Sequence, residues 1–273
     1  MPDPTATSPS PGALFRALHD DFFVMPNPWD GASAKLLASQ GFKALASSSA
    51  ALAWTMARPD RSVTRDEAVA HAAMIAKTTG LPVNGDFESG YGDTPEGVAA
   101  TIKASIDAGL AGCSIEDLPT HETGTLYDEA TACRRLEAAR NAIVQSGADF
   151  VLTGRCEAYL AGIPEPFEVV TARLKAFAPL SDVLYAPGVT DADELATLVA
   201  LTDKPLNVIG GLGGVSDDLN ALKALGVKRV SLGSNPAKVA YGALWAMANE
   251  LYNGRVMPAA KGAGRAIADA LKS

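Results

Sequence analysis

Short runs of apolar and β-branched residues alternate along the chain with alanine-rich segments of helical character. This alternation is typical of βαβ units and predicts a parallel sheet. Eight such runs begin about 29 residues apart on average, which is the length of one strand with its crossover helix. The predicted strands are Phe22–Met25, Phe42–Ser47, Leu81–Asp86, Gly112–Glu116, Phe150–Gly154, Val183–Tyr185, Leu206–Ile209 and Val227–Leu232.

The order of these units predicts the architecture. Helix starts are marked independently, for example by Thr64 and Glu67 at capping-box spacing. Eight consecutive units without a charge run or a long linker favour an α/β fold of the (β/α)8 TIM barrel type over a doubly wound sheet. We therefore expect a disordered N-terminal tail over residues 1–12 and a single barrel domain with a C-terminal helical tail over residues 13–273.

Composition and charge narrow the class of protein. The chain has 273 residues, with 23 Lys and Arg against 31 Asp and Glu, and a net charge of −8. An acidic chain without a basic cluster argues against nucleic acid or an anionic membrane as a partner. The first twelve residues lack the basic and apolar regions of a secretory signal, and the three cysteines show no zinc-ligand spacing. These features predict a cytoplasmic protein.

The helix predicted after the eighth strand, Asn235–Leu251, is apolar around more than one face. Such a helix needs burial on two sides. The C-terminal tail could cover it, or it could form a contact between subunits.

Charged side chains gather where the predicted strands end, which is where barrels build their active sites. Asp86 ends the third strand and Glu88 follows it, Glu116 ends the fourth, and Arg155 follows the fifth. Neighbouring carboxylates repel unless a cation lies among them, and oxygen ligands favour Mg²⁺ or Mn²⁺ over zinc. Arg155 offers a bidentate clamp for a substrate carboxylate. Equally, Asp86 and Glu116 could cap helices or form ion pairs with Arg155.

Glycine-rich turns suggest a competing site. Gly210–Gly214 follows the seventh strand and Gly233–Asn235 the eighth, where barrels often bind phosphate through backbone N–H groups. Tight turns between strands and helices produce the same pattern, so the signal is weak.

Five segments resemble the isocitrate lyase/phosphoenolpyruvate mutase superfamily in order and spacing. They are PNPWDGASAKLLASQGFKALASSSAALA, RPD, GDFESGYGD, SIED and TGRCEAYL, and the likeness runs from about Phe22 to Leu251. The resemblance implies a Mg²⁺-dependent (β/α)8 barrel that acts on a small-molecule carboxylate. It also implies a homo-oligomer, commonly a tetramer built as a dimer of dimers, with the eighth helix swapped between subunits.

The resemblance assigns a metal site to four acidic residues. Asp86 matches the aspartate that holds Mg²⁺, directly or through water, and Glu88 stands where the superfamily usually has a second aspartate. Glu116 of the IED motif and Asp60 of the RPD motif match two further acids of that site. The longer side chain of Glu88 suits a ligand that acts through water.

The same comparison implies a substrate site. Ser48, Ser49 and Ala50 match the backbone cradle for the substrate carboxylate and its 2-oxo oxygen. Arg155 matches the arginine that contacts the bound 2-oxo acid or its enolate.

The loop after the fourth strand, residues 118–128, departs from the superfamily. It contains no cysteine, which disfavours isocitrate-type cleavage. Phosphonomutases use a Lys-Thr-Asn sequence there, but Glu122 and Gly124 replace its Lys and Asn, which removes a positive charge where a phosphonate must be neutralised. His121, Glu122 and Tyr127 could transfer a proton, or could simply be exposed loop residues.

These observations predict a Mg²⁺-dependent lyase that cleaves a C–C bond of a small 2-oxo or 2-hydroxy carboxylate through a metal-stabilised enolate, as in oxaloacetate decarboxylation. One alternative is C–P chemistry of the phosphoenolpyruvate phosphonomutase or phosphonopyruvate hydrolase type. Another is a catalytically inactive member that only binds a carboxylate.

Overall fold

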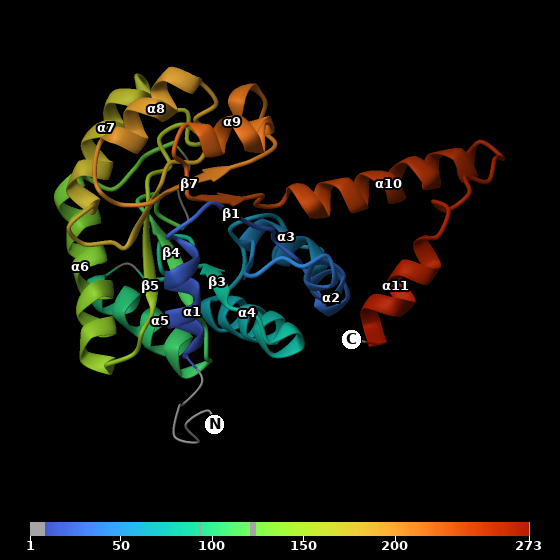
Figure 1. Ribbon diagram of the computed structural model, residues 1–273, viewed down its shortest axis with the longest axis horizontal. Helices are drawn as coiled ribbons and strands as arrows, with labels where there is room; N and C mark the ends of the chain where they lie inside the picture. The colour runs from blue at the N-terminus through green and yellow to red at the C-terminus, as the bar shows by residue number, and fades with distance from the viewer. Residues whose placement is uncertain (1–8, 93, 121–123, 273) are drawn as a thin grey trace, which may run out of the picture.

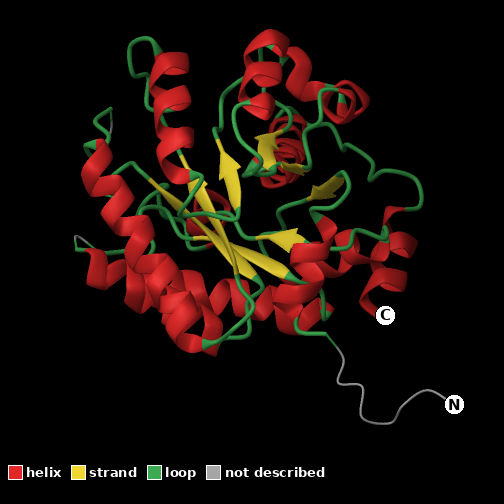
Figure 2. Cartoon of the chain, turned by 60° about the vertical axis from the view of Figure 1, so that its left-hand side comes forward, coloured by secondary structure: helices red, strands yellow, loops and turns green. Residues whose placement is uncertain are grey.

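Eight parallel strands form the centre of the molecule, a computed structural model that describes residues 9–92, 94–120 and 124–272. The order in the sheet is β1-β8-β7-β6-β5-β4-β3-β2. All eight predicted strands are present, and helices surround them (Figure 2). The strands are β1 (Phe23–Met25), β2 (Leu45–Ala46), β3 (Val83–Asp86), β4 (Gly112–Glu116), β5 (Val151–Arg155), β6 (Val183–Tyr185), β7 (Leu206–Ile209) and β8 (Arg229–Ser231).

The strands at the two ends of this order, β1 and β2, are joined through individual hydrogen bonds. The N–H of Ala46 donates to the carbonyl of Pro26 at 3.1 Å. The side-chain amide of Asn27 donates to the carbonyl of Ser47 at 2.8 Å, and its oxygen accepts from the N–H of Leu232 at 2.8 Å. Asn27 therefore joins the ends of three strands, and the arrangement confirms the predicted (β/α)8 TIM barrel.

Helices cover the outer face of the sheet, and Figure 1 shows α1 lying against the strands near β5. Their bounds are α1 (Pro11–Leu18), α2 (Gly31–Ser39), α3 (Ser49–Thr55), α4 (Arg65–Thr79), α5 (Pro95–Asp107), α6 (Glu129–Ser146), α7 (Pro166–Phe177), α8 (Ala192–Ala200), α9 (Leu219–Ala224), α10 (Asn235–Tyr252) and α11 (Ala263–Lys272), with a short 3-10 helix at Gly214–Asp217.

Local capping explains two of the helix starts. The predicted capping box of α4 is confirmed, since Thr64 Oγ1 accepts from the N–H of Glu67 at 3.3 Å and the Glu67 carboxylate accepts from the N–H of Thr64 at 2.8 Å. Helix α1 begins at Pro11, inside the segment expected as a tail, because the Ser10 hydroxyl caps it by accepting from the N–H of Ala13.

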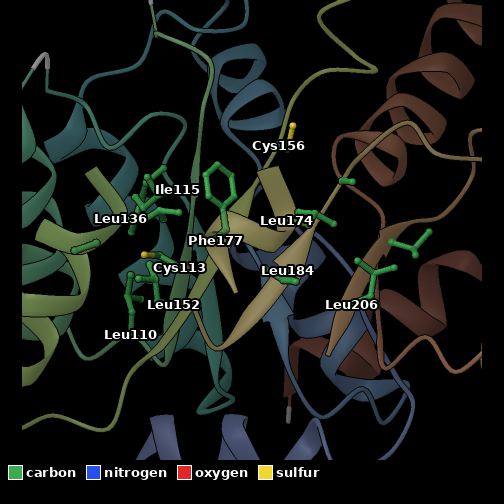
Figure 3. Close-up of a cluster of buried hydrophobic side chains, with 14 of the residues drawn as sticks. Leu110, Cys113, Ile115, Leu136, Leu152, Cys156, Leu174, Phe177, Leu184 and Leu206 are labelled. Carbon is green, nitrogen blue, oxygen red and sulfur yellow. The ribbon is translucent and has the colours of Figure 1, made fainter. Parts of the chain in front are cut away.

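The main apolar core lies between the sheet and the surrounding helices. Cys113 and Cys156 are fully buried in it, which confirms that they are packing residues, and Figure 3 shows Cys113 beside Leu152 and Leu110. The barrel interior is unusually polar. In most barrels of this type, branched apolar side chains fill the interior. Here its polar members include Asn84, Ser114, Thr153, Asn207, Arg229 and Ser231.

Helix α10 projects away from the barrel, and α11 turns back beside α2 (Figure 1). Several large apolar side chains of α10 are exposed, including Trp245 at 74% and Tyr252 at 92%. Within the part of the chain that the structure describes, no helix is both long and apolar enough to cross a membrane.

Candidate active site

Asp86 is held firmly at the end of β3. Its N–H donates to Ser47 Oγ at 2.8 Å, and its Oδ2 accepts from the N–H and the hydroxyl of Ser49 at 2.9 and 3.1 Å. The preceding Gly85 has a packing role, because a Cβ there would lie 2.3 Å from the ring of Phe87. The GDF sequence thus folds Phe87 back against the strand while the Asp86 carboxylate meets the start of α3.

Arg155 at the end of β5 is the centre of the charge cluster. Its Nη1 lies 3.1 Å from Asp86 Oδ1, its Nη2 lies 3.5 Å from Glu116 Oε2, and its Nε forms an ion pair with Glu157. The guanidinium also lies 5.1 Å from the ring centroid of Tyr185. Burial alone would lower the pKa of Arg155, but the surrounding carboxylates outweigh burial and raise this pKa well above its usual value.

Glu116, at the end of β4, is buried between two arginines. Its Oε1 accepts from Arg61 Nη1 at 2.9 Å, and its Oε2 faces Arg155. Burial is the largest influence on this carboxyl group and raises its pKa well above the usual range, although both guanidinium groups oppose the shift. Arg61 was not among the predicted site residues.

Glu88 has no such partner. It is 2% exposed, and neither carboxylate oxygen makes a regular hydrogen bond within the described residues. The chain leaves the extended conformation after Asp86, and Glu88 takes a φ of 48° in the left-handed region. Burial, reinforced by the negative charges of Asp86 and Asp60, raises the pKa of Glu88 to about 7 against the effect of Arg61.

Asp60 lies at the rim, in the loop between α3 and α4. It is an exposed residue, and its Oδ1 accepts from the N–H of Arg61 at 2.8 Å. Partial desolvation of its carboxylate, together with repulsion by Asp86, raises its pKa. The raised pKa values of Asp60, Glu88 and Glu116 share their largest cause, since loss of solvent around each carboxylate outweighs the nearby guanidinium groups.

The acidic side chains of the cluster offer oxygen ligands to a divalent cation. In the described ranges, no three His, Cys, Asp or Glu side chains are grouped closely enough to hold an ion directly. The donor set consists of oxygens, however, and Glu88 offers two buried carboxylate oxygens without partners. Mg²⁺ in proteins usually keeps several waters and binds through one or two carboxylates. The residues therefore fit a largely hydrated Mg²⁺ better than an ion enclosed by carboxylates.

The predicted carboxylate cradle lies next to Asp86. Ser48 is buried and is the N-cap of α3, since its Oγ accepts from the N–H of Ala51 at 3.3 Å. The N–H of Ser49 already donates to Asp86, and Ala50 is half-buried beside it. A substrate carboxylate at this helix start would share the donors of Ser49 with Asp86.

The loop after β4 is described only in part. His121 and Glu122 lie outside the described residues, so their assignment stays a prediction. Tyr127 is held in place, because its carbonyl accepts from Arg173 at 2.6 Å and its ring lies 4.5 Å from the guanidinium carbon of Arg135.

A cavity of about 30 Å³ opens between Asp86 and Arg155 and extends into the barrel toward Arg229. The glycine loop after β7 offers less to an anion. The N–H of Gly213 donates to Asp217 Oδ1 at 3.0 Å, and that of Leu212 donates to Ser216 Oγ at 3.1 Å. These backbone donors are already used, one of them by a carboxylate, so the structure gives no support to a phosphate site there.

Two charged residues of the site were missed from the sequence. Arg61 follows Asp60 directly, and Glu157 lies two positions after Arg155, where it is 3% exposed. The N–H of Glu157 donates to Asp117 Oδ1 at 2.9 Å, which fixes the turn after β5. The one available signal was their position beside predicted site residues.

The comparisons with known proteins agree with this geometry. The family model of phosphoenolpyruvate phosphomutase matches residues 15–252. An oxaloacetate decarboxylase from Chromohalobacter salexigens is 30% identical over 225 residues, which cover 79% of this chain and 76% of that protein. Its named activity is one of C–C cleavage.

Two solved structures share the fold over nearly the whole chain. A Burkholderia cenocepacia J2315 structure with the provisional description lyase/mutase is 40% identical, covers 95% of both chains and superposes with a TM-score of 0.86. The structure of oxaloacetate acetylhydrolase in complex with the product oxalate is 25% identical, with 96% of this chain and 94% of that chain covered and a TM-score of 0.86. The proteins to which this chain is similar thus include lyases and mutases.

Proposed function

Because the chain belongs to the phosphoenolpyruvate phosphomutase family, we propose that it is a Mg²⁺-dependent carbon–carbon lyase acting on a small 2-oxo or 2-hydroxy carboxylate. The observation that carries the proposal is the cluster at the ends of β3, β4 and β5. There the half-buried Arg155 lies 3.1 Å from the anchored carboxylate of Asp86, and the buried carboxylate of Glu88, which forms no ion pair within the described residues, lies in the same acidic group. Such a cluster combines an anion clamp with oxygen ligands for a cation.

The residues divide the work between metal and substrate. Asp86, Glu88, Glu116 and Asp60 would hold Mg²⁺, which when bound polarises the 2-oxo group and stabilises negative charge on the enolate. Arg155 would hold the substrate carboxylate and its developing enolate in place. Asp86 keeps its orientation through the hydrogen bond that its own N–H donates to Ser47 Oγ and through the two donors of Ser49 at the start of α3.

The substrate carboxylate and the proton need further groups. Ser48, Ser49 and Ala50 at the start of α3 would receive the carboxylate on the side of Asp86. After C–C cleavage the enolate takes up a proton, from water or from His121 or Glu122 of the loop after β4. Cleavage that releases a small neutral fragment such as CO₂ requires no cation on that loop, which agrees with Glu122 and Gly124 in place of Lys and Asn.

The experiment that tests this proposal is ligand-dependent thermal stability. We expect oxalate, a planar dianion that resembles the pyruvate enolate, to raise the melting temperature only when Mg²⁺ is present. At about 100 times its Kd a ligand adds about 2.7 kcal/mol to the free energy of unfolding, which is an easily measured shift. Pyruvate release from oxaloacetate, inhibited by EDTA, is then the activity to measure. Absence of any shift with Mg²⁺ and oxalate together contradicts the proposal.

The assembly and location follow as companion proposals. The exposed apolar side chains of α10 support exchange of this helix between subunits in a homo-oligomer, and a tetramer is measured by light scattering. Residues 13–273 form one domain in this proposal, since α11 packs on α2 of the barrel. Three free cysteines suit a reducing compartment, so the proposed location is the cytoplasm.

A further inference from the structure

A single guanidinium joins the acidic cluster to the loop that follows β4. Arg61 Nη1 donates to Glu116 Oε1 at 2.9 Å. On its other sides, Arg61 Nε donates to the carbonyl of Thr120 at 2.9 Å, and Nη2 donates to the carbonyls of Pro119 and Leu118 at 2.8 and 3.3 Å. Arg61 thus holds three successive carbonyls of one loop and one carboxylate of the site at the same time.

The conformation of Arg61 shows that this contact is enforced by its surroundings. Its φ is 64°, in the left-handed region that a side chain of this size rarely adopts. Its side chain is only 20% exposed. Burial alone would lower the pKa of Arg61, but Glu116 and Glu88 outweigh burial and raise it, so the group is charged at any working pH.

The contacts of Glu116 show how the positive charge of Arg61 affects cation binding. One of its carboxylate oxygens is bonded to Arg61 and the other faces Arg155, so both are occupied by guanidinium groups. A cation that uses Glu116 must share this carboxylate with Arg61, or displace Arg61 from it. Displacement would also loosen the carbonyls of residues 118–120, because the same planar group holds them.

We propose that Arg61 is a positioning residue that couples cation binding at the acidic cluster to the placement of residues 118–120, where the loop after β4 begins. The inference rests on the proposed function, since it takes that cluster as a Mg²⁺ site. Its positive charge opposes cation binding in the absence of substrate. The N–H donors of its guanidinium hold the carbonyls of residues 118–120 in the position that substrate binding requires.

Two variants separate the charge of Arg61 from its hydrogen bonds. Arg61→Ala removes both, whereas Arg61→Lys keeps the charge but cannot donate to three carbonyls and a carboxylate at once. Arg65→Ala is the matched control, because Arg65 lies four residues away and pairs with the exposed Asp66. Mn²⁺ affinity is measured by paramagnetic titration without ligand, and oxalate affinity by calorimetry with saturating Mn²⁺.

Arg61→Ala should change the affinities for Mn²⁺ and for oxalate in opposite directions. Arg61→Ala binds Mn²⁺ about fourfold or more tightly, because a nearby positive charge is lost, and it binds oxalate about tenfold more weakly, because the loop start is released. Arg61→Lys keeps the wild-type affinity for Mn²⁺ but binds oxalate more weakly than wild type. Arg65→Ala matches wild type in both affinities.

Other results overturn the inference. If Arg61→Ala weakens Mn²⁺ and oxalate binding together, or changes neither, Arg61 does not couple them. Should Arg61→Ala fail to fold, the split between Mn²⁺ and oxalate in Arg61→Lys decides alone, and a lysine variant that binds oxalate as wild type does refutes the role of the guanidinium donors. Wild-type protein that binds no Mn²⁺ is a different failure, because it contradicts the proposed function itself.

Discussion

Two arginines, one half-buried and one fully buried, line the same barrel, and their surroundings are opposite. Arg155, at the end of β5, contacts three carboxylates. Arg229, at the start of β8, donates to Asn207 Oδ1 at 2.8 Å and to Thr153 Oγ1 at 2.9 Å. No carboxylate is among the partners of Arg229 in the described residues. We refer to these two regions as the mouth and the floor of the barrel.

The floor is a neutral hydrogen-bonding network around one charge. His19 of α1 shares it, since its Nε2 lies 3.3 Å from Arg229 Nη1 and its Nδ1 lies 2.9 Å from the carbonyl of Phe15. The carbonyl requires a proton on Nδ1, so Nε2 is free to accept from Arg229 and the ring is neutral. Burial lowers the pKa of Arg229 to about 9, and burial together with Arg229 lowers that of His19 to about 3.

The difference separates function from stability. At the mouth, acids outnumber the arginines that neutralise them, which is the charge pattern expected of the proposed cation and carboxylate site. At the floor, every contact of the guanidinium serves the fold itself. Changes at the mouth should therefore affect ligand binding most, and changes at the floor should affect the free energy of unfolding most.

Loss of the anchored acid at the mouth should have the largest effect. We expect Asp86→Ala to lower pyruvate release from oxaloacetate by about 100-fold or more and to abolish the Mg²⁺-dependent shift with oxalate, because a metal-site acid is lost. Asp107→Ala is a suitable control, since Asp107 forms an exposed ion pair with Lys103 far from the site. Unchanged turnover in Asp86→Ala would refute the site assignment.

A matched pair of substitutions compares the two regions directly. Arg229→Met should lower the free energy of unfolding by about 2–3 kcal/mol, because Asn207 and Thr153 lose their buried donor. Its oxalate affinity in the presence of Mg²⁺ should remain within about twofold of wild type. Arg155→Met should lose oxalate binding. The comparison fails if denaturant unfolding and calorimetry show both variants losing stability and oxalate affinity in the same proportion.

The pH dependence of the free energy of unfolding tests the floor, and its expected effect is the smallest of those described. The unfolded chain protonates His19 near pH 6.5, but the folded protein does so only near pH 3. Stability from the neutral ring is thus complete above pH 6.5 and is lost as the pH falls toward 3, by up to about 1.4 kcal/mol per pH unit. His19→Gln should flatten this slope. Carboxylates titrate in the same range, so the difference between the two proteins isolates His19, and parallel curves would show that the ring does not titrate as described.

The sequence by itself determined the eight strand-helix units, the capping box of α4 and the row of acids at the ends of the strands. These are local properties, because periodicity, caps and strand ends depend on residues within one turn or one strand of each other. The strand ends also sufficed to place Asp86, Glu116 and Arg155 together, since the carboxyl ends of parallel strands meet at one edge of a barrel.

Which charged side chains contact one another depends on the tertiary structure. Arg61 and Glu116 are 55 positions apart in the chain, and Arg229 and His19 are 210 apart. No spacing rule links such pairs, because their distance is set when the barrel closes and its loops pack. The same closure left Glu88 buried in a left-handed turn, without an ion-pair partner among the described residues, whereas alternation along an extended strand would have placed it beside Asp86. Charge balance inside this barrel is therefore a property of the folded molecule.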